Sequence, residues 1–127
     1  MLGKPAASES YLWQFATGQD GKIFGCTYPG AKLVSFDPAT DKMEDLGRMH
    51  PTEMYARSLA VGPNGKVYVG IGTEKGDLVV FDPATKAHRS IIPPGLRGAP
   101  GWQTVGVSRR SDGNVYAELG TNLMRVD

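Results

Sequence analysis

The sequence predicts an all-β protein that is built from a repeated four-stranded unit. Three observations lead to this prediction: glycine is frequent, glycine turns recur at a regular interval, and a short apolar run follows each turn. The chain of 127 residues contains 17 glycines, about twice the usual share. No stretch of about 11 residues shows the periodicity of an amphipathic helix, and Gly and Pro interrupt the chain throughout.

Glycine turns mark the expected hairpin tips, and the runs KIFGCTY, KVYVGIG and NVYAELG follow them. Asp-Gly and Asn-Gly tolerate positive φ at both central positions of a type I′ turn, which links two antiparallel strands tightly. We therefore expect three type I′ hairpins. Their central pairs are Asp20-Gly21, Asn64-Gly65 and Asp112-Gly113.

A second marker repeats in step with the first. The segments LVSFD, LVVFD and LMRVD begin at Leu33, Leu78 and Leu123, about 45 positions apart. After Asp37 and Asp82 the chain continues as Pro-Ala-Thr, and Asp followed by Pro favours a type I turn. A further strand should follow each of these turns, at KMEDLG and KAHRSII.

Each unit therefore contains four short strands, expected in the second unit at residues 57–61, 66–71, 77–81 and 87–92. A four-stranded unit that repeats roughly every 40 to 50 residues is typical of a β-propeller blade. A β-sandwich, the alternative, seldom repeats its turn chemistry so closely. We expect the end of a preceding blade and a connecting loop at 1–10, blade 1 at 11–54, blade 2 at 55–101, and an incomplete blade 3, without its outer strand, at 102–127.

The recurring glycine hairpin and the Phe-Asp-Pro-x-Thr turn resemble the blades of bacterial propellers related to kelch, streptogramin-lyase-like and gluconolactonase-like proteins. The resemblance covers almost the whole chain. It implies the architecture of a propeller. Because several of these proteins are lyases or lactone hydrolases, it also implies an alternative role as a fragment of a propeller enzyme whose complete site needs more blades.

The number of units predicts an assembly. By register, about eight positions are missing from three whole units, and three blades are fewer than the roughly four to eight that close a ring. An open row would expose an apolar sheet face at its ends. Either the chain is a segment of a longer protein or copies of it associate. We expect a homodimer that closes a six-bladed ring, with a larger ring as the second choice.

Composition excludes several classes of function. The formal net charge is +1 and the basic residues are scattered, so we expect no nucleic-acid partner. Neither a signal peptide nor an apolar span is visible, so we expect no membrane partner and, by default, a cytoplasmic location. Cys26 is the only cysteine and, like His50 and His88, it lies in no metal-binding pattern. We therefore expect no metal and no cofactor.

The candidate binding residues lie in the segments that lead into the innermost strands, because ligands of propellers gather there around the central channel. These segments, at 8–13, 52–57 and 101–104, combine aromatic rings with carboxylate and guanidinium groups, which suit a sugar or another polar ligand. The predicted ligand-binding residues are Glu9, Tyr11, Glu53, Tyr55, Arg57, Trp102 and Gln103.

A purely structural interpretation stays open for the same residues. Tyr11, Tyr55 and Trp102 would then be one repeated packing position between blades. Glu9 and Glu53 would cap loops, and Arg57 would be their ion-pair partner. No nucleophile elbow, phosphate-binding loop or alternating calcium-binding acids occur. We therefore expect a non-catalytic module that binds a small polar ligand, a carbohydrate for example, or a protein partner at the channel mouth.

Overall fold

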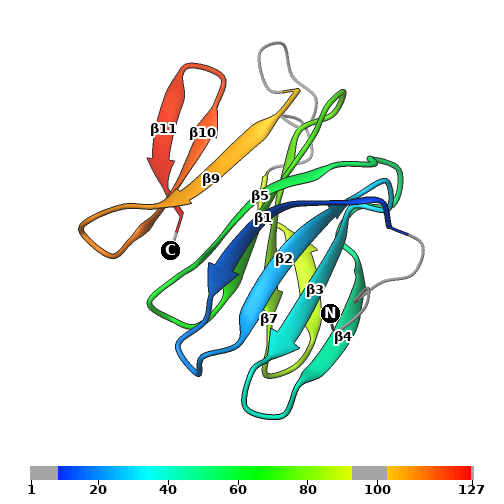
Figure 1. Cartoon of the computed structure of the whole chain (residues 1–127). Helices are drawn as coiled ribbons and strands as arrows, with labels where there is room; N and C mark the ends of the chain where they lie inside the picture. Colours follow the sequence, from blue (N-terminus) through cyan, green and yellow to red (C-terminus); the bar gives the residue numbers. More distant parts are fainter. Residues whose placement is uncertain (1–8, 93–102, 127) are drawn as a thin grey trace.

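The computed structural model describes residues 9–92 and 103–126, which form three antiparallel sheets (Figure 1). Within these ranges no helix is present, so none could span a membrane. The all-β prediction is confirmed.

The three sheets follow one another along the chain, and in each sheet the strands pair in sequence order. We call the sheets blade 1, blade 2 and blade 3. Blade 1 contains β1 (Tyr11–Thr17), β2 (Ile23–Tyr28), β3 (Lys32–Asp37) and β4 (Lys42–Arg48). Blade 2 contains β5 (Ala56–Val61), β6 (Val67–Ile71), β7 (Asp77–Asp82) and β8 (Ala87–Ser90). Blade 3 contains β9 (Val105–Arg109), β10 (Val115–Leu119) and β11 (Asn122–Arg125), without a fourth strand in the described residues.

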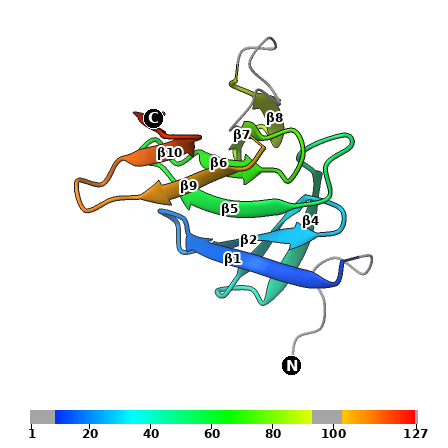
Figure 2. The same cartoon turned by 90° about the horizontal axis from the view of Figure 1, so that it is seen from above.

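The first strand of blade 2 and that of blade 3 each pack against the preceding blade. Strand β5 contacts β1 and β2, and β9 contacts β5 and β6 in the same way. Figure 2 shows β1, β5 and β9 in succession across the stacked sheets. The three innermost strands are therefore neighbours, as the arrangement of propeller blades around an axis requires.

Two apolar cores hold the blades together, and blade 2 contributes to both. Val69 and Val79 pack toward blade 1, beside Phe24. Tyr68 and Val80 lie on the opposite face of the same sheet and pack toward blade 3. The alternation follows from the two-residue period of a strand, and a strand that is covered on both faces reads as a continuous apolar run.

Equivalent hydrogen bonds join blade 1 to blade 2 and blade 2 to blade 3. The Leu59 N–H donates to the Gln14 Oε1 atom of blade 1 at 3.2 Å, and the Val107 N–H donates to the Ser58 hydroxyl of blade 2 at 2.9 Å. Gln14 and Ser58 occupy equivalent positions, each following the irregular residue of its innermost strand. A side chain of one blade thus satisfies a backbone donor at the edge of the next.

The glycine turns lie where they were predicted, but their type differs. In each predicted pair only the glycine has a positive φ, for example +80° at Gly65, whereas a type I′ turn needs it at both positions. The prediction of type I′ turns is therefore wrong. The Gly65 N–H donates to the Gly62 carbonyl, and the Gly62 N–H donates to the Lys66 carbonyl across a three-residue loop. The Asn64 side chain accepts from the Lys66 N–H at 3.0 Å, which favours a type I turn with a glycine bulge.

The turns after β3 and β7 also lie at their predicted places. The Thr40 N–H donates to the Asp37 carbonyl at 3.2 Å, and the Asp37 carboxylate accepts from the Ala39 N–H at 3.0 Å. The Asp82 carboxylate accepts from the Ala84 N–H at 2.9 Å in the same way. Strands β4 and β8 follow these turns, as predicted.

Candidate functional site

A β-bulge interrupts the innermost strand of blade 1, and another interrupts that of blade 2 at the equivalent position. In β1 the register with β2 shifts between Leu12 and Gln14, so Trp13 has no partner across the ladder. In β5 the register with β6 shifts between Ala56 and Ser58, which leaves Arg57 in the equivalent position. Bulges re-aim a side chain and are common beside functional sites.

The two bulge residues contact one another within a group of aromatic rings from blades 1 and 2. We call Tyr11, Trp13, Tyr28, Tyr55 and Arg57 the aromatic cluster. The rings of Tyr28 and Tyr55 stack with centroids 4.4 Å apart. Trp13 lies 5.7 Å from Tyr55, and Tyr11 lies 6.1 Å from Trp13 and 5.9 Å from Tyr28. These separations are favourable for aromatic pairs.

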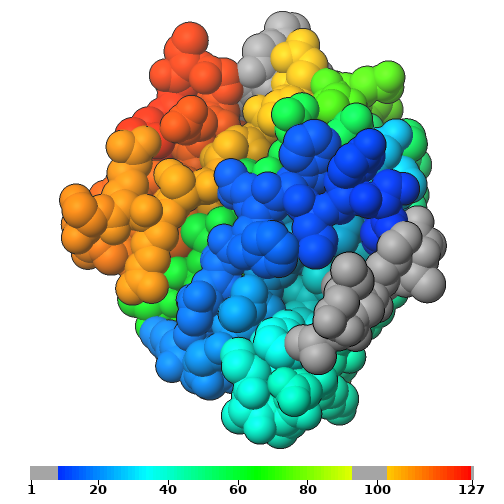
Figure 3. Space-filling view, viewed as in Figure 1, coloured from blue at the N-terminus to red at the C-terminus, as the bar shows by residue number. Residues whose placement is uncertain are grey.

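The rings of the aromatic cluster differ in their exposure to solvent, which shows which rings pack between blades and which are accessible. Tyr28 and Tyr55 are half-buried, so their stack joins blade 1 to blade 2. Tyr11 is 62% exposed and Trp13 is 43% exposed. In Figure 3 the blue atoms of β1 lie at the molecular surface. The cluster therefore contains two rings that pack and two rings whose faces a ligand can reach.

Arg57 lies over the rings instead of pairing with an acid. Its guanidinium carbon is 5.5 Å from the centroid of Trp13 and 5.4 Å from that of Tyr55. Both distances are within the range of a cation–π contact. Among the described residues Arg57 forms no ion pair with Glu9 or Glu53, in contrast to the structural interpretation of the sequence.

Glu53 is held by the loop between β6 and β7. Its Oε1 atom accepts from the backbone N–H groups of Thr73, Glu74 and Lys75 at 2.8, 2.8 and 3.0 Å. Burial raises the pKa of the Glu53 carboxyl, but the hydrogen bonds from these three donors hold that pKa below its ordinary value. The geometry is that of a loop-capping carboxylate.

Glu9 has the equivalent role in blade 1. It is buried, and its carboxylate accepts a short hydrogen bond from the Thr27 hydroxyl and another from the Gly30 N–H at 2.8 Å. The loop between β2 and β3 is thereby tied to the segment that precedes β1. Both predicted glutamates thus lie near the aromatic cluster in the chain, but their carboxylates bind backbone and hydroxyl donors.

The remaining predicted residues belong to the third blade. Gln103 is exposed, and Thr104 beside it forms an isolated bridge with Gly72, the residue equivalent to Tyr28. A Cβ atom at Gly72 would lie 2.3 Å from the Gln103 carbonyl oxygen. The structure therefore joins blades 2 and 3 by backbone contact where blades 1 and 2 use a ring stack. Trp102 lies outside the described residues.

Two members of the aromatic cluster, Trp13 and Tyr28, are not among the predicted ligand-binding residues. Trp13 lies within the predicted segment 8–13, whereas Tyr28 ends β2 directly opposite Tyr11 and lies outside every predicted segment. The signal was available in the sequence, because the run KIFGCTY ends in an aromatic residue where the equivalent run KVYVGIG ends in glycine.

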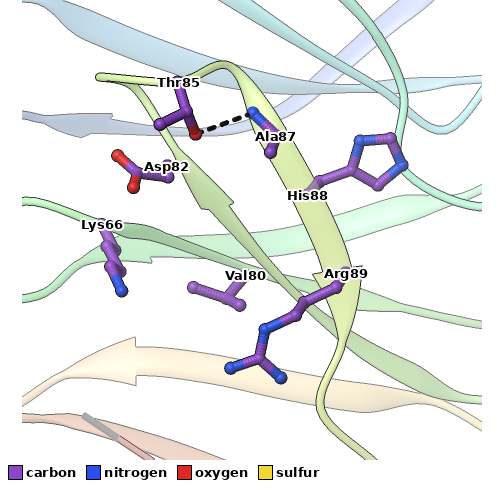
Figure 4. A pocket seen from close by; sticks show the side chains of 7 residues that line it. All are labelled: Lys66, Val80, Asp82, Thr85, Ala87, His88 and Arg89. Atoms are coloured by element: carbon purple, nitrogen blue, oxygen red, sulfur yellow. Dashed lines mark hydrogen bonds between the residues drawn. The ribbon is translucent and has the colours of Figure 1, made fainter.

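Hollows also lie elsewhere on the described surface. A groove with a volume of about 510 Å³ follows the innermost strands and is lined from β1, β5 and β9, including Gln14, Leu59 and Val107. A smaller pocket lies on the outer side of blade 2 (Figure 4), where Lys66, Asp82 and Arg89 surround Val80. The groove has the position that a propeller's central channel requires.

The residues considered for metal or thiol chemistry lie apart from the aromatic cluster. His88 lies on β8 and lines the outer pocket, whereas the Nδ1 atom of His50 accepts from the backbone N–H groups of Thr52 and Glu53. Burial raises the pKa of the Cys26 thiol to about 12, so this thiol is not an active nucleophile near neutral pH. In the described ranges no three metal-ligating side chains gather.

Solved structures with the same arrangement of strands identify the fold. The chain is similar to a streptogramin B lyase, with a TM-score of 0.71 and 14% identity over 94% of this chain and 38% of the lyase. It is similar to a catalytically inactive virginiamycin B lyase from Staphylococcus aureus solved with quinupristin, with a TM-score of 0.72 and 12% identity over 97% of this chain and 40% of that one.

A third structure, the WD40 β-propeller domain of Doa1, matches with a TM-score of 0.63 and 16% identity over 94% of this chain and 37% of that chain. The predicted propeller blades are thereby confirmed. The chain spans about two fifths of the length of the two lyases. No protein-family model and no curated protein sequence matches it.

Proposed function

We propose that this propeller module binds a small polar ligand, a carbohydrate for example, on the aromatic cluster. The observation that carries the proposal is the pair of exposed rings, Tyr11 and Trp13, beside the guanidinium group of Arg57. An exposed ring offers a flat apolar face to the C–H side of a sugar, and a guanidinium group offers directional donors to its oxygens.

The proposed role is non-catalytic. General acid catalysis by a carboxyl group needs a raised pKa, whereas the pKa of Glu53 is lowered. The Glu9 carboxylate is buried and bound to the Thr27 hydroxyl and the Gly30 N–H. Neither glutamate is thus presented to a ligand on the exposed rings.

The alternative function is that of a fragment of a propeller enzyme of the lyase or lactone hydrolase class. It is favoured by the span of the chain, about two fifths of two lyases of the same fold. In that case the aromatic cluster would bind substrate while further blades supplied the reacting groups. Turnover of a bound ligand by this chain alone would contradict the non-catalytic proposal.

A glycan screen followed by isothermal titration calorimetry tests the proposal. Trp13→Ala should weaken binding of any retained glycan about tenfold, because it removes a stacking surface of the kind that dominates interfaces. Met124→Ala is the matched control, since Met124 is 49% exposed but lies on β11 of blade 3. Retention of no glycan by the wild type, or equal binding by both variants, would overturn the proposal.

We also propose that a second copy closes the ring over blade 1. Phe15 is 62% exposed, although its equivalent in blade 2, Leu59, is buried in the core between blades. A large exposed apolar face favours a partner. Light scattering should give the mass of a dimer for the wild type and of a monomer for Phe15→Asp, and a stable wild-type monomer at micromolar concentration would contradict this assembly.

A further inference from the structure

We infer that the ligand of the aromatic cluster is an acidic saccharide, whose carboxylate pairs with Arg57 while a sugar ring stacks on Trp13 or Tyr11. The inference rests on the proposed function and specifies its ligand class. It follows from three features of the described residues: an arginine without an acidic partner, carboxylates that are already engaged, and a guanidinium group held in place by rings.

The first feature is the state of Arg57 itself. Its contacts in the described residues are the two cation–π contacts, with Trp13 and Tyr55. Within the described residues no guanidinium N–H group of Arg57 donates to an oxygen or nitrogen acceptor, so these donors remain for a ligand. Those donors have the fixed fork that matches both oxygens of a carboxylate.

The nearby Arg48 provides a contrast. Its Nε atom donates to the His50 carbonyl at 3.1 Å, and its Nη2 atom donates to the Glu53 carbonyl at 2.9 Å. Arg48 therefore fastens the loop that leads from β4 to β5. Of these two arginines, one is used by the backbone of the protein and the other is presented at the exposed rings.

The second feature is the charge around the cluster. The carboxylates that precede β1 and β5 in the chain, Glu9 and Glu53, are both buried. Glu53 accepts three backbone N–H groups through one oxygen, so much of its charge is balanced locally. The guanidinium group of Arg57 is therefore the charge that a ligand on Trp13 and Tyr11 meets first, and an anionic ligand suits it.

The third feature is preorganisation. The bulge in β5 leaves Arg57 outside the ladder, and its guanidinium group lies against two rings, Trp13 of β1 and Tyr55 before β5. A long side chain that is already held loses less freedom when a ligand binds. A neutral sugar would stack on the rings and accept single hydrogen bonds from Arg57, whereas an acidic sugar would stack on the rings and add a paired, charge-assisted contact with the guanidinium group.

Calorimetry with trigalacturonate and its methyl ester separates the two possibilities, because esterification removes the charge and keeps the sugar. Trigalacturonate should bind about tenfold more tightly than the ester at low salt, and added NaCl should reduce this preference. Arg57→Gln should abolish the preference while Arg89→Gln, an exposed arginine of the outer pocket, should keep it.

The outcomes distinguish this inference from the function on which it rests. Equal or tighter binding of the ester, or an unchanged preference in Arg57→Gln, would overturn the acidic ligand and leave a neutral carbohydrate site intact. Binding of neither trigalacturonate nor its ester, with a neutral glycan retained in the screen, would also overturn it. Binding of no saccharide at all would overturn the proposed function as well.

Discussion

Blades 2 and 3 present equivalent faces that differ in charge. In blade 2 the face toward the next blade carries Gly70, Leu78 and Val80, all buried. In blade 3 the register places Glu118 at the position of Gly70 and Arg125 at that of Val80, both exposed, while Leu123 stands at the position of Leu78 and is 50% exposed. The backbone ladder is thus the same, and the face of blade 3 differs by the two charged side chains that it presents to solvent.

The loop between the second and third strands also differs between blades 2 and 3. Between β6 and β7 the chain is long enough to surround the Glu53 carboxylate. Between β10 and β11 only Gly120 and Thr121 intervene, and Gly120 has a φ of +63°. Blade 3 therefore repeats the strands of blade 2 without its covered face and without its capping loop, so substitutions should affect blade 2 far more strongly.

The largest effect is expected for Gly70→Ala. A Cβ atom there would lie 2.1 Å from the Val105 carbonyl oxygen, so blade 3 would have to move away, at a cost of about 3 kcal/mol in free energy of unfolding. Gly106→Ala in blade 3 is the control, because its nearest neighbour would be 3.8 Å away. Urea denaturation measures both, and similar losses would contradict the comparison.

Ser58→Ala should have the second largest effect. The Ser58 hydroxyl accepts from the Val107 N–H at 2.9 Å, and removing it leaves a buried donor without that partner, which costs about 1 to 3 kcal/mol. Ser108→Ala, at an exposed site of blade 3, should change the free energy of unfolding by about 0.5 kcal/mol or less. A small effect at Ser58 would show that blade 2 adapts to the loss.

Glu53→Gln should destabilise the protein by about 1 kcal/mol near neutral pH, because a neutral amide binds the three loop N–H groups less strongly. The folded pKa of Glu53 lies below its ordinary value of 4.5. Its contribution is therefore complete above that value and is lost as pH falls through the folded pKa. Denaturation from pH 7 to pH 3 should show the two proteins converging, and a constant difference would contradict this role.

The smallest effect is expected for Glu118→Gln in blade 3. Its carboxylate lies 3.7 Å from Arg110, and both side chains are exposed. Exposed pairs contribute about 0 to 1 kcal/mol, so the change in stability should lie at the low end of that range. The measurement uses the Phe15→Asp monomer, in which no second copy covers blade 3, and a loss there as large as that of Glu53→Gln would contradict the comparison.

Strands and blade order could be predicted from the sequence because each depends on a local pattern. The turn after Asp37 recurs after Asp82, and an apolar run follows the glycine turn in all three units. The turn type could not be predicted from the Asn64-Gly65 pair alone, because it depends on which backbone groups close the loop, here those of Gly62 and Lys66.

The candidate site was predictable only in part for a related reason. Residues such as Tyr11 and Arg57 could be selected because they precede or begin inner strands. The position of Tyr28 depends on the register between β1 and β2, and the partners of Glu53 lie in a loop 20 to 22 positions further along the chain. Contacts of this range depend on how neighbouring strands and loops meet, which residue spacing alone does not specify.

The bulges at Trp13 and Arg57 have a consequence for how such a protein can diversify. A residue outside the ladder has no cross-strand partner, so its replacement leaves strand pairing unchanged. Blades 1 and 2 therefore each offer one variable position on the same frame, and these two already differ, with an indole in one and a guanidinium group in the other. Ligand preference can be altered one blade at a time, by single substitutions that do not disturb folding.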